Sequence, residues 1–203
     1  MRNQSADRAY FFSQDNWYTM KNFTRDNLSF SLCGLNCKLC PMQIGGYCPG
    51  CGGGAGNQSC AIARCSLQHN HVEYCYLCPE FPCSQFDGAE DYDSFITHQR
   101  QLSHINHAKE IGLEAYNQEL TRKSKILDTL LAEYNDGRRK SFYCVAVNLL
   151  PLTRIEKIME QVVNEPFMNS LPMKDKSAYV VKVFEDNASQ SGLTLKLRKK
   201  PAA

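Results

Sequence analysis

The crowding of cysteines constrains this chain more than any other feature. Ten of its eleven cysteines fall between Cys33 and Cys83, in a chain of 203 residues. The same segment is rich in glycine and proline, which favour tight turns and interrupt long regular elements. It holds too few apolar side chains to fold by burial alone. We therefore expect a small cysteine-rich, metal-bound module that is irregular, with few regular elements, because ligation can supply the missing stability.

The amino-terminal residues indicate the compartment. Residues 1–30 carry scattered charges and no unbroken apolar run, so they predict neither a signal peptide nor a membrane anchor. We expect a cytoplasmic protein on this ground. In a reducing cytosol disulfides do not persist, so clustered cysteines there bind metal or carry out redox chemistry more often than they form disulfides.

Four cysteine pairs have spacings typical of metal ligands. They are Cys37 and Cys40, Cys48 and Cys51, Cys60 and Cys65, and Cys75 and Cys78. A CxxC turn places two sulfurs about 3.5 to 4 Å apart, which suits two corners of a tetrahedron with zinc–sulfur bonds of about 2.3 Å. Two pairs complete one site, so we expect two zinc ions. The spacing allows the first pair to join the second or the third.

Cys33 and Cys83 stand outside these pairs and are candidates for additional ligands. With Cys37 and Cys40, Cys33 spells CxxxCxxC, a spacing that radical enzymes use to leave one iron of a four-iron cluster free for S-adenosylmethionine. Those enzymes need a long run of alternating strands and helices after the motif, and this sequence does not predict one.

Simple iron–sulfur binding is the alternative to zinc. A proline follows Cys40 and another follows Cys78, as in ferredoxins, although the CxxCxxCxxxCP run itself is absent. Paired CxxC units suit tetrahedral zinc, so the sequence favours zinc.

The cysteine motifs also resemble those of a known family. The strings CGLNCKLCP from Cys33, CPGC from Cys48, CAIARC from Cys60 and CYLCPEFPC from Cys75 are similar to those of the bacterial and archaeal family called domain of unknown function 3795. The resemblance covers about residues 31–88. It implies zinc binding through the many cysteines and implies no established reaction.

Other residues with metal-binding or reactive side chains have simpler interpretations. His69 and His71 lie between cysteine pairs, where thiols already outnumber two tetrahedra, so we expect a solvated loop. His104 and His107 lie one turn apart on a predicted helix and are interpreted as a polar helix face. Cys144 stands among apolar residues and is expected to be a buried, inert thiol. The sequence shows no catalytic constellation, so no enzyme is predicted.

The rest of the chain predicts a mostly α-helical region. Residues 1–30 are expected to be a polar extension, 31–88 the cysteine-rich module and 89–203 the helical region. Periodic apolar residues predict helices from Ser94 past Ile105, over Leu113–Tyr134, from about Arg139 to Pro151, from Leu152 to Val162 and from about Pro172 to Gly192. Alternating residues from Leu193 to Leu197 predict a short strand. Aromatic residues near the last cysteines are expected to pack the module onto the helices: Tyr74, Tyr76, Phe81 and Phe86.

Charge limits the partners. The formal net charge is +2, but residues 31–90 carry two basic and four acidic residues before any thiolate is counted. Four thiolates on each zinc make this segment more negative still, so we do not expect nucleic acid to bind it. The predicted function is a metal-binding protein with structural zinc and an interaction or regulatory role, which leaves a protein partner open and involves no membrane. The alternative is an iron–sulfur protein in electron transfer or redox sensing.

Overall fold

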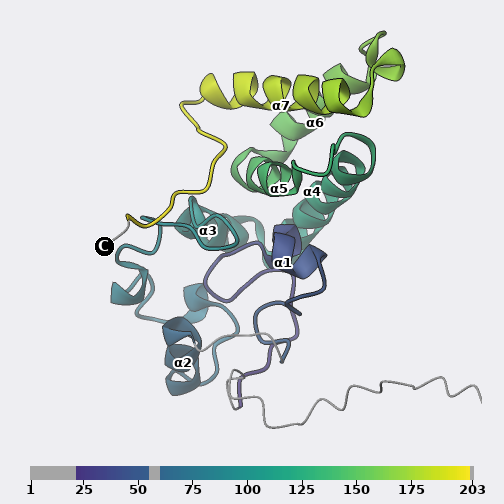
Figure 1. Ribbon diagram of the computed structural model, residues 1–203. Helices are drawn as coiled ribbons and strands as arrows, with labels where there is room; N and C mark the ends of the chain where they lie inside the picture. The colour runs from purple at the N-terminus through teal and green to yellow at the C-terminus, as the bar shows by residue number, and fades with distance from the viewer. Residues whose placement is uncertain (1–21, 55–59, 202–203) are drawn as a thin grey trace, which may run out of the picture.

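The computed structural model describes residues 22–54 and 60–201 (Figure 1). Over these ranges the chain forms seven α-helices and four short 3-10 helices, and no strand. The prediction of a mostly helical region after the cysteines is therefore confirmed.

Four of the predicted helices lie close to their expected positions. Their bounds are Leu113–Glu133 for α4, Lys140–Leu149 for α5, Leu152–Val163 for α6 and Met173–Ser189 for α7. Pro151 and Pro172 are the N-caps of α6 and α7, where a missing N–H costs nothing. Gly137, with a φ of +89°, turns the chain between α4 and α5.

The first predicted helix begins later than expected. Helix α3 spans Gln101–Ile111, whereas the prediction began at Ser94. The Asp93 carboxylate accepts the backbone N–H of His98 at 2.6 Å and the hydroxyl of Thr97 at 3.3 Å. These hydrogen bonds fix a loop instead of a first helical turn, and Phe95, an apolar residue within the expected helix, is 61% exposed.

The predicted strand at Leu193–Leu197 is wrong. No neighbouring strand pairs with this segment within the described chain. Instead it leaves α7 and runs back beside the loop before α3 (Figure 1), where Asp93 donates its N–H to Arg198 O at 2.8 Å. Leu195 is buried there. The alternation of leucines thus reflects packing of an irregular segment on one side.

The segment before the cysteines is packed in its described part. Residues 1–21 of the predicted polar extension lie outside the described residues. Phe30 is fully buried, with its ring 4.6 Å from that of Tyr116 on α4 and 5.7 Å from that of Tyr74. Residues 22–30 therefore belong with the cysteine-rich region.

One hydrophobic core joins the cysteine-rich region to the helices. Phe30, Leu39 and Tyr74 share it with side chains of α3 to α7, and Tyr76 and Phe81 pack against it, as predicted. A smaller cluster within the cysteine-rich region consists of Phe23, Leu32 and Ala63. Helix α4 packs against α3, α5 and α6, and α6 packs against α7. In Figure 1, α6 and α7 lie at one end of the molecule and α2 (Ala61–Gln68) at the other.

Candidate metal centres

Short elements present the cysteines. They are the 3-10 helices Cys37–Leu39, Cys75–Leu77 and Ser84–Phe86, the one-turn helix α1 (Pro41–Ile44) and α2. Cys40 is the N-cap of α1 and Cys60 the N-cap of α2. All eleven cysteines lie within the described residues, where each is a free thiol.

Four cysteines form what we call the first thiol group: Cys33, Cys37, Cys51 and Cys60. Each lies near enough to at least two of the others for charge on one thiol to raise the pKa of another. Burial is the largest cause of the shifts, which raise the pKa of Cys33 to about 11 and that of Cys37 to about 12.

Polar groups lie beside the thiols of the first thiol group. The Cys33 sulfur lies 3.2 Å from the Ser31 hydroxyl oxygen, and hydrogen bonds from the backbone N–H groups of Cys51 and Leu32 lower the pKa values of Cys37 and Cys51, respectively. Such hydrogen bonds lower the pKa of each thiol against the effect of burial, because they favour the thiolate. Thiolates are the form in which cysteines bind metal.

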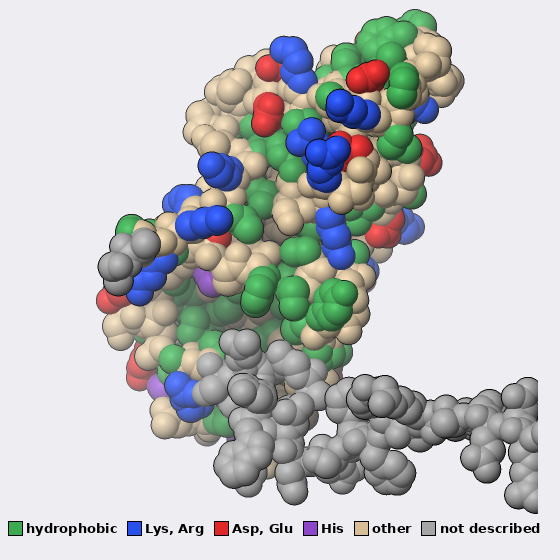
Figure 2. Space-filling model, viewed as in Figure 1, with side chains coloured by type: hydrophobic (Ala, Val, Ile, Leu, Met, Phe, Trp, Pro, Cys, Tyr) green, Lys and Arg blue, Asp and Glu red, His purple; other side chains and the backbone are tan. Residues whose placement is uncertain are grey.

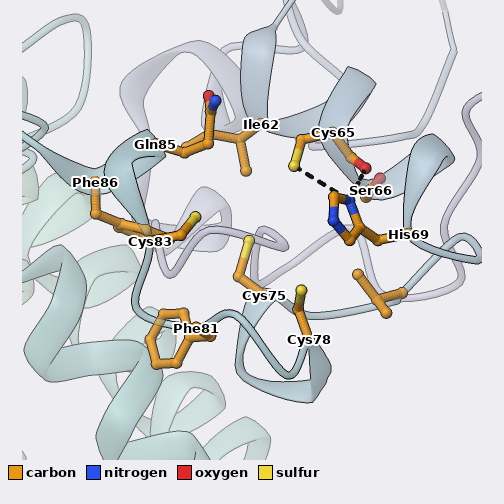
Figure 3. A pocket seen from close by; sticks show the side chains of 11 residues that line it. Ile62, Cys65, Ser66, His69, Cys75, Cys78, Phe81, Cys83, Gln85 and Phe86 are labelled. Atoms are coloured by element: carbon orange, nitrogen blue, oxygen red, sulfur yellow. Dashed lines mark hydrogen bonds between the residues drawn. The ribbon is translucent and has the colours of Figure 1, made fainter.

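A second thiol group surrounds a cavity of about 20 Å³. Its members are Cys65, Cys75, Cys78 and Cys83, whose side chains point toward a shared space in Figure 3. Burial raises the pKa values of Cys65 and Cys75, and charge on the other thiols of the group raises both values further. Each of the four thiols therefore lies near at least two of the others. The rest of the lining is mostly apolar and includes Ile62, Phe81 and Phe86.

His69 adjoins this cavity at the end of α2. Its Nδ1 lies 3.5 Å from the Cys65 sulfur and 2.9 Å from the Cys65 carbonyl oxygen, and its Nε2 lies 3.4 Å from Glu80. The hydrogen bond to the carbonyl, followed by that to Glu80, raises the pKa of His69. His69 thus contacts a predicted ligand, whereas His71 is exposed in the following turn.

The remaining three cysteines, Cys40, Cys48 and Cys144, belong to neither set of four, although charge on Cys40 raises the pKa of Cys37 in the first thiol group. Charge on Cys48 also raises the pKa of Cys40, and charge on Cys40 raises that of Cys144 on α5, while the Lys140 ammonium lowers the pKa values of both Cys40 and Cys144 against burial. Burial nevertheless raises the pKa of Cys144 to about 12, which fits the predicted inert thiol.

This grouping differs from both pairings that the sequence allowed. Cys75 and Cys78 stay together, while the other three pairs are divided among the groups. Cys33 and Cys83, the candidates for additional ligands, each complete a set of four. Sequence spacing fixes how far apart two sulfurs can lie, but packing of the turns decides which cavity each sulfur faces. The sequence signals for Cys33 and Cys83 are the CxxxCxxC spacing that begins at Cys33 and the motif CYLCPEFPC that ends at Cys83, and neither assigns these thiols to a group.

The two helix histidines have separate partners. Burial, with the nearby Lys123 and Arg100, lowers the pKa of His104 to about 3, and its Nδ1 lies 3.4 Å from Asn36 Nδ2. His107 lies 3.1 Å from Glu119. Neither histidine belongs to a thiol group.

The cysteines of each thiol group lie near one another, but their sulfurs are not arranged to coordinate a single ion. Over residues 22–54 and 60–201, no three His, Cys, Asp or Glu side chains converge closely enough to hold one ion. A single metal ion would therefore bind either group only after the turns that carry its sulfurs moved closer together.

Comparisons with family models, curated proteins and solved structures gave no significant match to this chain. The resemblance of the cysteine motifs to a zinc-binding family stays a prediction. Among the described helices, none is both long and apolar enough to cross a membrane.

Proposed function

We propose that the cysteine-rich region is a metal–thiolate module with two centres, one in each thiol group, and that its metals stabilise the fold. The observation that carries the proposal is the division of eight free thiols into two sets of four. Four thiolates are the ligand number of a structural zinc ion and of a four-iron cluster.

Zinc is the first candidate for both centres. A zinc ion bound by four thiolates has no open position, so its role is structural and it contributes its binding free energy to folding. The CxxC turn of Cys75 and Cys78 within the second thiol group supports this choice. So do the backbone N–H groups directed at the first thiol group, since outer hydrogen bonds of this kind orient metal ligands.

An iron–sulfur cluster is the second candidate, because four thiolates are also the ligands of such a cluster and a proline follows both Cys40 and Cys78, as in ferredoxins. This assignment carries an electron-transfer or redox-sensing role.

The function that accompanies structural zinc is an interaction or regulatory one. Two centres with four thiolates on each zinc add negative charge to an already acidic segment, which disfavours phosphate backbones. Lys and Arg side chains are spread over the helical end of the face shown in Figure 2, with Asp and Glu among them. That distribution supports a protein partner over a nucleic acid.

Metal analysis of anaerobically purified full-length protein tests the proposal. Two zinc ions per chain in a colourless sample support structural zinc. A brown sample with iron and sulfide replaces zinc with iron–sulfur clusters and keeps the metal–thiolate module. A folded protein without bound metal overturns both assignments.

A further inference from the structure

An apolar groove crosses the surface between α5, the loop before α3 and the C-terminal segment. Its first part lies beside Phe95, and its mostly apolar lining includes Pro41 of α1 and Val145 of α5. Its second part is a hollow of about 250 Å³, with a lining that includes Phe142, Leu195 and Leu197. The two parts adjoin, because Ser141 and Val145 line both. We call them together the α5 groove.

Phe95 is the most exposed apolar side chain of the α5 groove. It is 61% exposed, although its neighbours Ile96 and Val145 are buried. Water in contact with this ring is unfavourable, and a partner that covers the ring gains that hydrophobic free energy. In Figure 2 hydrophobic side chains reach the surface over α1, with Lys and Arg on the helical side of them. Apolar surface with a polar rim is typical of interaction sites.

The rim of the α5 groove is basic. Lys196 and Lys199 are exposed and line the hollow, and Lys140 stands at the start of α5, directly before Ser141. The described residues that line the two parts include no Asp or Glu. Glu185 of α7 lines a further hollow, which shares Lys196 with this one. The groove therefore attracts negative charge in a partner.

Hydrogen bonds fix the wall of the groove that the C-terminal segment forms. The Asp93 carboxylate accepts the backbone N–H of Arg198 at 2.6 Å, and the Asp93 N–H donates to Arg198 O at 2.8 Å. The Gln99 side chain donates to Lys196 O at 3.2 Å. The Asp93 side chain is fully buried in these contacts. A wall that is already ordered loses less conformational entropy when a partner docks.

We propose that the α5 groove binds an acidic peptide segment of a protein partner, whose apolar side chains cover Phe95 and enter the hollow while its carboxylates face the lysines of the rim. The inference names the partner class of the interaction role proposed above and rests on that role. It does not rest on metal, because none of the eight thiols of the two thiol groups lines the groove. The mostly apolar lining favours a peptide over a phosphate backbone, which binds to runs of cations.

Selection from a display library of random linear peptides, with the purified full-length protein as bait, tests this inference. We expect enrichment of peptides that combine Asp or Glu with large apolar residues. The selected peptides are then synthesised with a fluorescent label, and their affinities for the protein and its variants are measured by anisotropy.

Two exposed positions of the groove are then changed. We expect Phe95→Ala to weaken binding of the selected peptides by about 10-fold or more, as for a central anchor of an interface. We expect Lys199→Glu to weaken it by about two- to fivefold, with a smaller effect at high salt. Phe167→Ala is the matched control, because Phe167 is also exposed but lies on the loop between α6 and α7. Its affinity should match that of wild type.

Several outcomes overturn the inference. They are the absence of enriched peptides, enrichment of peptides without acidic residues, and wild-type affinity in Phe95→Ala. If Phe95→Ala does not fold, Lys199→Glu decides, and wild-type affinity at low salt then overturns the inference. A mixed-sequence oligonucleotide that displaces every selected peptide and binds more tightly also overturns it, in favour of nucleic acid.

Metal content of the same samples separates this inference from the metal–thiolate proposal. A metal-free protein that binds acidic peptides through Phe95 keeps the docking site and overturns the metal centres. A metal-loaded protein that selects no acidic peptide overturns the docking site alone.

Discussion

Cys75 donates its backbone N–H to the carbonyl oxygen of Leu32 at 2.8 Å, and this hydrogen bond ties the two thiol groups together. Leu32 directly precedes Cys33 of the first thiol group, and charge on Cys33 raises the pKa of Cys75. The two candidate centres are therefore neighbours that share backbone contacts. We expect the loss of metal from one centre to disturb the thiols of that centre most and those of the neighbouring centre less.

Serine substitutions at Cys51 and Cys48 test the grouping of the thiols. Cys51 belongs to the first thiol group, whereas Cys48 lies beside Cys40. We expect Cys51→Ser to lose about one metal centre per chain, because a four-thiolate site loses a ligand. We expect Cys48→Ser to keep both centres. Metal content per chain is the measurement, and equal loss in the two variants would show that these cysteines share a site, as their CxxC spacing predicted.

Loss of metal is expected to unfold the cysteine-rich region before the helices. We predict that Cys37→Ser or Cys78→Ser loses metal and raises amide hydrogen exchange over residues 33–88, since binding free energy there is largely folding free energy. Helices α5 and α6 should stay protected, because their own side chains form much of the core. Cys144→Ser is the control, with metal content expected to match wild type. Full metal content with unchanged exchange in both variants would contradict the prediction.

The sequence predicted the helices well and the candidate centres incompletely. Leu120, Leu127 and Leu130 lie on one face of α4 with helical spacing, and local periodicity of this kind survives in the folded chain. The failures arise from contacts distant in sequence. Leu195 resembles a strand residue, yet it packs into the helical core, and the segment around it bonds through Lys196 and Arg198 to Gln99 and Asp93, about a hundred residues earlier in the chain. No local pattern encodes these contacts.

The cysteines show the same limit. Spacing predicts the four cysteine pairs as ligands and leaves Cys33 and Cys83 as candidates for additional ligands. It does not predict which of these ten thiols lie together in the folded chain. The sequence places Arg25 in the predicted polar extension, whereas its burial depends on Glu73 and Tyr74, far along the chain. Contacts between turns that are distant in sequence cannot be read from residue spacing.

Phe30 is expected to be a main link between the amino-terminal segment and the helices. Phe30→Ala removes a fully buried ring that stacks on Tyr74 and packs at a tilt against Tyr116, so we expect it to lower the free energy of unfolding by about 3–5 kcal/mol. Chemical denaturation of the metal-loaded protein is the measurement. Phe95→Ala is the control, because Phe95 is largely exposed, and a change within about 0.5 kcal/mol is expected there. Equal effects of the two substitutions would contradict the packing described for residues 22–30.

Because burial lowers the pKa of Lys123, we expect the free energy of unfolding to rise at alkaline pH. Its Nζ donates to Leu150 O at 2.9 Å from a buried position, and burial lowers its pKa from 10.5 to about 8, with Glu119 opposing and Arg100 adding to the shift. Below pH 8 the lysine is charged in both states and contributes no pH dependence. Between about pH 8 and 10.5 the unfolded chain binds more protons than the folded one, so the free energy of unfolding rises with pH.

Lys123→Met removes this contribution. The difference in the free energy of unfolding between wild type and Lys123→Met should grow in favour of wild type over that interval, by up to about 1.4 kcal/mol per pH unit. Taking the difference cancels the titration of the tyrosines and other lysines. Lys125→Met, at an exposed position of the same helix, should give a flat difference. A flat difference for Lys123→Met as well would mean that Lys123 keeps its ordinary pKa and reaches solvent in the folded protein.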